Sequence, residues 1–258
     1  REWYNGYNWL GESVYNPFDV LLLFQKRDFR PYWFETGTPT FLLDWIKTHH
    51  VWLPELATLR LSGDLLQAFD VDMMLTESLM FQTGYLTIAK RDYQFGEYLY
   101  QLRYPNREVY QSFHNSVLYV LQPDAGQSSR TKHQLGQLLL KNDFAGMEVL
   151  FHSLFSSIPY DWQRNNAIAQ YEGYYASVFY SYFAALGLDI RLEDITNKGR
   201  IDMAVLFNQQ VYLFEFKVVE ATPQGKALQQ LKDRGYAEKY RSRGEPIHLI
   251  GVDRKSVV

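Results

Sequence analysis

The pattern of hydrophobic and polar positions is clearest in the C-terminal part of the chain. Apolar residues at helical spacing predict a helix over 165–186 that ends at Gly187. Apolar runs predict a strand over 189–196, a hairpin over 199–218 and a strand over 247–253, with a helix over 224–241 before the last strand. The order is α-β-β-β-α-β. Since a strand–helix–strand connection is normally a right-handed parallel crossover, we expect a mixed sheet with a helix on each face.

The N-terminal part shows shorter and more mixed patterns. Asn16-Pro17 and Thr38-Pro39 each place a capping side chain before a proline suited to the first helical turn, so residues 1–50 are predicted to be mostly helical. Apolar segments at 85–88 and 98–104 predict a hairpin around a polar loop. Pro105-Asn106 then predicts the start of a helix near 109–121.

A change in composition divides these two parts. The run AGQSSR at 125–130 is rich in Gly and Ser and has no apolar anchor, so we interpret it as a linker. Helices are predicted after it at 132–141 and 143–157. We therefore expect two domains, 1–125 and 130–258, in a protein that is α+β overall with an α/β C-terminal core.

Composition limits the classes of protein. The 258 residues are 47% apolar, enough for sizeable cores, and no apolar run is long enough to span a membrane. There is no secretion signal, so we expect a cytoplasmic location and no membrane partner. The absence of cysteine excludes thiolate chemistry and leaves carboxylates as candidate metal ligands. Because the chain begins at Arg1 without a Met, we expect a fragment or processed form.

Three charges interrupt the apolar hairpin GRIDMAVLFNQQVYLFEFK: Asp202, Glu215 and Lys217. A turn at Asn208-Gln209 places Asp202 directly across from Glu215, and alternation puts Glu215 and Lys217 on one face of the strand. Two opposed carboxylates destabilise a strand pair. A hard divalent cation such as Mg²⁺ relieves the repulsion, and the lysine then lies beside a metal-bound water. The alternative is a partly exposed hairpin in which the lysine only neutralises one acid.

The neighbouring helices carry further candidates. Glu172 lies on the apolar stripe of the first predicted helix, where it either joins the carboxylates or reaches solvent at the edge of the stripe. Gln229, Gln230 and Lys232 follow the second strand of the hairpin and either meet phosphates or form a solvated face, and we expect the latter for at least one glutamine.

The spacing of Asp202 from Glu-x-Lys, with Glu172 on the preceding helix, resembles the PD-(D/E)XK nuclease superfamily, whose restriction-endonuclease-like core has the same α-β-β-β-α-β order. The segments YEGYYASVFYSYFAALGLDI, GRIDMAVLF, VYLFEFKV and ALQQLKDRGYAEKY look like the branch found behind an AAA-ATPase-like domain in bacterial proteins. VYNPFDVLLLF and YWFETGTPTFLLDWI resemble the tail of that ATPase part. Ile201 stands where the family name has Pro.

The resemblance implies a metal-dependent deoxyribonuclease. It assigns Asp202, Glu215 and Glu172 to a Mg²⁺ site that could also take Mn²⁺, and Lys217 to catalysis. It makes Gln229 or Gln230 the helical glutamine, and we place both with Lys232 at the substrate. No GxxxxGK[ST] loop occurs, so we expect no ATP site in this chain. DNA is the expected partner with RNA left open, and an ATPase domain or a homo-oligomer is the other partner considered. The competing hypothesis is a non-catalytic DNA- or partner-binding module that works beside an ATPase.

Overall fold

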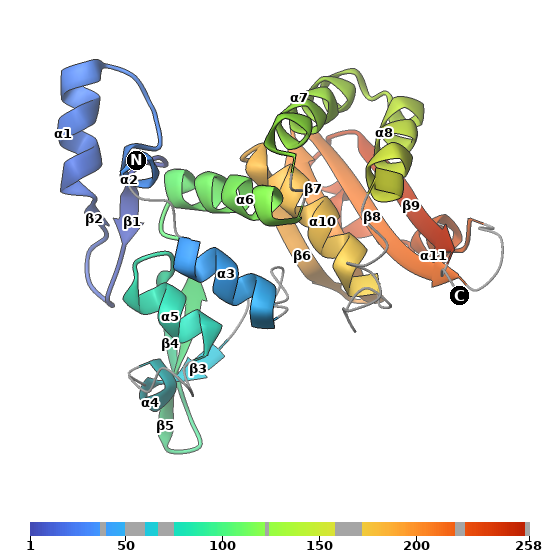
Figure 1. The fold of residues 1–258 in the computed structure, drawn as a ribbon. Coiled ribbons are helices and arrows are strands. Elements are labelled where there is room, and N and C mark those ends of the chain that lie inside the picture. The colour runs from blue at the N-terminus through green and yellow to red at the C-terminus, as the bar shows by residue number, and fades with distance from the viewer. Residues whose placement is uncertain are drawn as a thin grey trace. The chain divides into compact units, whose positions relative to one another are not determined.

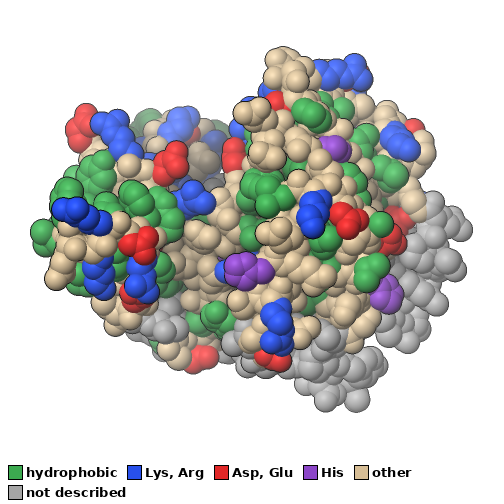
Figure 2. Space-filling model, turned by 90° about the horizontal axis from the view of Figure 1, so that it is seen from above, with side chains coloured by type: hydrophobic (Ala, Val, Ile, Leu, Met, Phe, Trp, Pro, Cys, Tyr) green, Lys and Arg blue, Asp and Glu red, His purple; other side chains and the backbone are tan. Residues whose placement is uncertain are grey.

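The computed structural model describes residues 1–36, 40–49, 60–66, 75–121, 124–157, 172–219 and 225–255. The chain forms two compact units, Arg1–Ser128 and Ser129–Val258. None of the described helices is long and apolar enough to cross a membrane. On the face shown in Figure 2, basic and acidic side chains lie interspersed, in keeping with a net charge of −3.

The first unit is a mixture of short helices and strands, seen in blue and green in Figure 1. Its elements are β1 (Asn5–Tyr7), β2 (Val14–Tyr15), α1 (Pro17–Lys26), α2 (Tyr32–Glu35), α3 (Thr40–His49), β3 (Arg60–Ser62), α4 (Gly63–Leu66), α5 (Thr76–Gln82), β4 (Thr87–Gln94), β5 (Glu97–Arg103) and α6 (Arg107–Leu121). The strands form a two-stranded ribbon, β1-β2, and a three-stranded sheet in the order β3-β5-β4.

Two of the predicted helix starts are confirmed by their caps. The Asn16 side chain accepts a hydrogen bond of 3.1 Å from the Phe18 N–H at the start of α1. The Asn106 side chain accepts one of 3.0 Å from the Val109 N–H at the start of α6. Thr38-Pro39 lies outside the described residues.

Two predictions for this unit need correction. The ribbon β1-β2 lies inside the region predicted to be mostly helical. It was not predicted because its strands are short and their register is irregular, which leaves little periodicity in the sequence. The hairpin β4-β5 is confirmed, but its strands continue through the residues that we took for a polar loop. Most of those residues are exposed on the strands of the hairpin, so polarity alone did not indicate a loop.

The second unit contains the predicted core. Its elements are α7 (Ala125–Lys141), which begins at the end of the first unit, α8 (Phe144–Ser157), α10 (Glu172–Ala185), β6 (Asp189–Thr196), β7 (Gly199–Phe207), β8 (Gln210–Val219), α11 (Lys226–Arg234), α12 (Glu238–Arg241) and β9 (Ile247–Lys255). From α10 onward the order is the predicted α-β-β-β-α-β, except that two helices, α11 and α12, stand where one was predicted. The sheet runs β6-β7-β8-β9, antiparallel except for the parallel pair β8 and β9, so it is mixed as expected.

The predicted linker AGQSSR is wrong. These residues form the first turns of α7, where the Asp124 side chain accepts a 3.0 Å hydrogen bond from the Gln127 N–H and caps the helix. Ser128 and Thr131 are buried within the fold, so the Ser-rich stretch is tied down by packing. Small polar residues at a capped helix start therefore imitate the composition of a linker.

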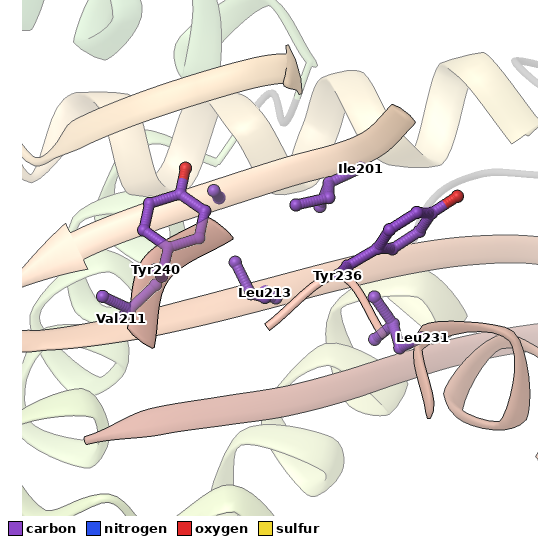
Figure 3. Close-up of a cluster of buried hydrophobic side chains, with 7 residues drawn as sticks. Ile201, Val211, Leu213, Leu231, Tyr236 and Tyr240 are labelled. Carbon is purple, nitrogen blue, oxygen red and sulfur yellow. The ribbon is translucent and has the colours of Figure 1, made fainter. Parts of the chain in front are cut away.

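The two faces of the sheet have different coverings. On one face, Phe214 of β8 packs edge-on against Phe183 of α10 at 5.3 Å between ring centroids, and Phe151 of α8 stacks on Phe179 at 3.7 Å. On the other face, strand residues such as Leu213 meet side chains from α11 and α12. Figure 3 shows this buried cluster, whose labelled members are Ile201, Val211, Leu213, Leu231, Tyr236 and Tyr240.

The helix predicted over 224–241 is two helices. Gly235 has φ of +60° and its N–H bonds the Lys232 carbonyl, so the backbone leaves the helical conformation and α11 ends at Arg234. The short helix α12 then places Tyr240 in the cluster. The break lets two elements cover the sheet face that carries Glu215.

Candidate metal and phosphate site

The hairpin β7-β8 has the predicted turn. Asn208 and Gln209 have φ of 50° and 57°, as a two-residue turn of the mirror-image type requires, and Phe207 pairs with Gln210. Regular pairing continues to Met203 opposite Phe214 and stops there, one pair short of Asp202 and Glu215. The register is the predicted one, but these two acids do not form a regular backbone pair.

At Asp202, a hydrogen bond to the side chain takes the place of a regular backbone hydrogen bond between β7 and β8. Its Oδ2 atom accepts a 2.9 Å hydrogen bond from the Phe216 N–H of β8. Ile201 and Ala204 lie in the same buried cluster although they are three residues apart, so the alternation of faces breaks at Asp202. This local distortion keeps the Asp202 carboxylate next to β8.

Glu215 is the buried member of the pair, with 3% of its surface exposed. Its Oε1 atom accepts a hydrogen bond from the Gln230 Nε2 of α11, while its Oε2 atom is buried with no hydrogen-bond partner among the described residues. Burial raises the pKa of Glu215 to about 7, with a further increase from the Asp202 carboxylate and an opposing effect of Lys217. A buried carboxylate oxygen that has no hydrogen-bond partner among the described residues, and that lies beside a second carboxylate, is suited to binding a cation.

Two residues of β9 bring α11 close enough for the Gln230 contact. Gly251 lies beside Glu215 in the parallel ladder, and a Cβ atom at this position would lie 2.2 Å from the Leu228 backbone nitrogen. Asp253 accepts hydrogen bonds of 2.7 Å and 2.9 Å from the first two backbone N–H groups of α11. Sequence reasoning missed both residues because each acts on a helix that is distant in the sequence.

Lys217 lies two residues beyond Glu215 on β8, so both side chains project from the face that α11 covers, as predicted. It is partly exposed and lies opposite Asp253 in the parallel ladder. Glu172 is the first residue of α10, but its side chain lies outside the described part of the structure. Its place at the site therefore stays a prediction.

Helix α11 turns one of its two glutamines toward the carboxylates. Gln230 contacts Glu215, whereas Gln229 is exposed and donates a 2.7 Å hydrogen bond to Asp233 on its own helix. The expectation that at least one glutamine belongs to the solvated face thus applies to Gln229. Lys232 is exposed in the last turn of α11.

Carboxylates are few at this site. Within the parts of the chain that the structure describes, no group of three Asp, Glu, His or Cys side chains is arranged to hold a metal ion. The site consists of Asp202 and Glu215, with Gln230 fixing one carboxylate oxygen and Lys217 beside them. Two acidic ligands, completed by water and substrate oxygens, are a common environment for Mg²⁺.

Comparison with known proteins agrees with this geometry. Residues 170–256 match the family model of the PD-(D/E)XK nuclease superfamily, and the matched range contains Asp202, Glu215 and Lys217. The resemblance is thus supported for the region from α10 to β9, where the mixed sheet is consistent with that nuclease fold. That superfamily is one of nucleases, and its members generally use divalent metals. The branch behind an ATPase-like domain stays a prediction.

A relative with a curated sequence covers the whole chain. The chain is 62% identical over 262 residues to the uncharacterized protein in the vnfD 5′ region of Azotobacter chroococcum mcd 1. The alignment includes 100% of this chain and 51% of that protein, so the chain spans about half the length of its relative. No solved structure matches the chain.

Proposed function

We propose that the protein is a metal-dependent phosphodiesterase that hydrolyses DNA. The observation that carries the proposal is the Oε2 atom of Glu215, which has no hydrogen-bond partner among the described residues and is buried beside the Asp202 carboxylate on a strand that also presents Lys217. The match of this region to a nuclease superfamily supports the same reading.

Asp202 and Glu215 would hold the cation, together with Glu172 of α10. A bound Mg²⁺ or Mn²⁺ would supply a water of lowered pKa and would neutralise charge on the scissile phosphate. Glu215 is held in place by Gln230, which leaves its second oxygen available as a ligand. The Asp202 carboxylate is held by the Phe216 N–H, so neither acid needs to reorganise much to bind.

Lys217 would act on the reacting groups. Its ammonium group can donate hydrogen bonds to the attacking water and to a phosphate oxygen, which positions the nucleophile. Gln229, Gln230 and Lys232 of α11 are the residues that we assign to the substrate phosphates, with Gln230 also contacting Glu215. The exposed ends of Gln229 and Lys232 leave them accessible to a polynucleotide backbone.

DNA is the substrate proposed because the matched superfamily is one of nucleases, and RNA stays open as an alternative substrate. The competing function is a binding module that has this fold but no activity. An ATPase domain or a second copy of the chain is the protein partner that we propose, and the chain itself is proposed to have no ATP site.

The experiment is incubation of the purified chain with plasmid DNA, linear DNA and RNA, in Mg²⁺, in Mn²⁺ and in EDTA. Cleavage of DNA that requires metal and is lost in Asp202→Asn supports the proposal. Asp189→Asn, which changes an exposed acid on β6, is the matched control and should cleave like the parent. Metal binding without cleavage of any nucleic acid would instead favour the binding module.

A further inference from the structure

The hairpin β4-β5 of the first unit carries exposed aromatic side chains at its tip. Phe95 in the turn is 103% exposed, and Tyr93 and Tyr98 on the adjoining strands are 64% and 47% exposed. Figure 1 shows the loop between β4 and β5 extending past the helices of its own unit. Three large rings therefore face solvent on one narrow projection.

Phe95 is poorly suited to the backbone conformation that it adopts in the turn. Phe95 and Gly96 have φ of 51° and 92°, the conformation of a hairpin turn that favours Asn-Gly and disfavours bulky side chains at the first position. Phe95 also buries none of its surface in the fold. Folding thus gains nothing from a phenylalanine at this position, which points to a contact outside the chain.

The adjoining strand residues place two rings and a guanidinium group side by side. Tyr93 and Tyr98 are cross-strand partners with ring centroids 5.0 Å apart, and the Arg91 guanidinium lies 4.5 Å from the Tyr98 ring centroid. Flat rings and a guanidinium plane are the surfaces on which unpaired bases stack. The Arg91 charge is available to a phosphate from that position.

The sheet is locally basic although the chain is acidic. Strands β3, β4 and β5 carry four basic residues and two acidic ones, so 4 − 2 gives a net charge of +2 against −3 for the chain. Asp92, one of the two acids, is already paired with Lys90 at 2.7 Å and with Arg60 at 3.8 Å. The local charge therefore complements a polyanion.

We propose that the β4-β5 hairpin binds single-stranded nucleic acid, with bases stacked on Phe95, Tyr93 and Tyr98 and the backbone near Arg91. In a duplex, neighbouring base pairs stack on the base faces that these rings would cover, which favours a single strand. The positive charge favours nucleic acid over an apolar protein surface. This binding site needs none of the hydrolytic chemistry of the second unit.

The test measures binding of the whole chain to labelled single-stranded DNA, single-stranded RNA and duplex DNA by fluorescence anisotropy in EDTA. Without metal, a failure of the proposed nuclease activity leaves the result unaffected. We expect both single strands to bind more tightly than the duplex. Preference for one single strand identifies DNA or RNA as the ligand, and equal or tighter binding of the duplex contradicts the proposal.

Phe95→Asn separates folding from binding because Asn suits the turn. We expect its thermal stability to equal or exceed that of the parent and its affinity for the single strand to fall about fivefold or more. Tyr119→Ala removes a ring that is 50% exposed on α6 and should bind like the parent. Parental affinity in Phe95→Asn would overturn the proposal.

Arg91→Gln tests the phosphate contact. The slope of log affinity against log salt should decrease by about 0.7 relative to the parent. An unchanged slope contradicts the assignment of Arg91. If the parent binds none of the three nucleic acids, or if Phe95→Asn only abolishes self-association measured by sedimentation, the hairpin contacts protein and the proposal is wrong.

Discussion

Each of the two units contains a pair of neighbouring carboxylates, and the pairs differ in what surrounds them. In the first unit, Asp19 of α1 and Glu108 of α6 are completely buried, and the Glu108 Oε1 atom accepts a 2.8 Å hydrogen bond from the Trp33 N–H. Burial, with the hydrogen bond and charge of Asp19, raises the pKa of Glu108 to about 9. In the second unit, Asp202 is only partly buried.

The two pairs differ in whether a positively charged side chain lies nearby and in how far the carboxylates are exposed to solvent. Among the described residues, no lysine or arginine influences the pKa of Asp19 or of Glu108, so that pair lowers its charge by retaining a proton. At the other pair, Lys217 opposes the increase in the pKa of Glu215. A sealed pair is thus suited to holding helices together, while a pair at the edge of solvent beside a lysine is suited to metal and phosphate.

Lys217→Ala gives the largest expected effect because it removes the positive charge that lies beside the carboxylates of the second pair. Nucleolytic activity should fall by a factor of about 10²–10⁴, since a positioned acid–base group contributes that much. Metal affinity should persist or increase, because a competing positive charge is gone. Activity assays with calorimetric titration of Mg²⁺ or Mn²⁺ check both. The exposed Lys141→Ala is the control, and parental cleavage by Lys217→Ala contradicts the mechanism.

Glu215→Ala should lower metal affinity and activity together, because it removes the ligand with the orphaned oxygen. The free energy of unfolding should stay the same or rise by up to about 1–2 kcal/mol, since repulsion from Asp202 is relieved. Calorimetry, DNA cleavage and thermal denaturation measure the three quantities. Replacement of the exposed Glu148 by Gln should alter none of them, and retained metal affinity in Glu215→Ala would remove this residue from the site.

Gly251→Ala should disturb the support of the second pair without touching either acid. The new methyl group would meet the α11 backbone, so the variant should lose about 1–3 kcal/mol of stability, and Gln230 should move away from Glu215. Thermal denaturation and the cleavage assay report the two effects. Gly11→Ala is a suitable control because a Cβ there meets nothing within 4 Å. Equal stability of the two variants would argue against the close approach.

Glu108→Gln has the smallest expected effect at neutral pH and tests the first pair. The folded pKa of Glu108, about 9, is above the ordinary value of 4.5, so between these values the folded state binds a proton that the unfolded state has lost. Stability from this group is therefore full at low pH and decreases as the pH rises toward 9, by up to about 1.4 kcal/mol per unit. Glu108→Gln should weaken this dependence.

Denaturant unfolding between pH 7.5 and 9 measures that slope, in a window above the pKa of about 7 given for Glu215. The comparison variant is Glu97→Gln, which changes an exposed acid of β5 and should keep the parental slope. An identical slope in Glu108→Gln and in the parent would mean that the first pair holds no proton in this range.

The two pairs also show how much of the site can be predicted from the sequence. Asp202 and Glu215 were predicted to meet because a turn of two residues fixes the register between neighbouring strands. Asp19 and Glu108 were not predicted, since they lie on helices far apart in the sequence and only tertiary packing brings them together. The choice of Gln230 over Gln229 likewise depends on the rotation of α11, which Gly251 and Asp253 of another strand determine.

The hydrogen bond from the Phe216 amide to the Asp202 carboxylate makes this amide a spectroscopic reporter. Its nitrogen and proton resonances depend on the charge of the oxygen that accepts the bond, whereas the Val211 amide bonds the Pro246 carbonyl at the far end of the strand. A cation that shares the Asp202 carboxylate would withdraw electron density from it. Titration followed by NMR should therefore shift the resonance of Phe216 and leave that of Val211 in place.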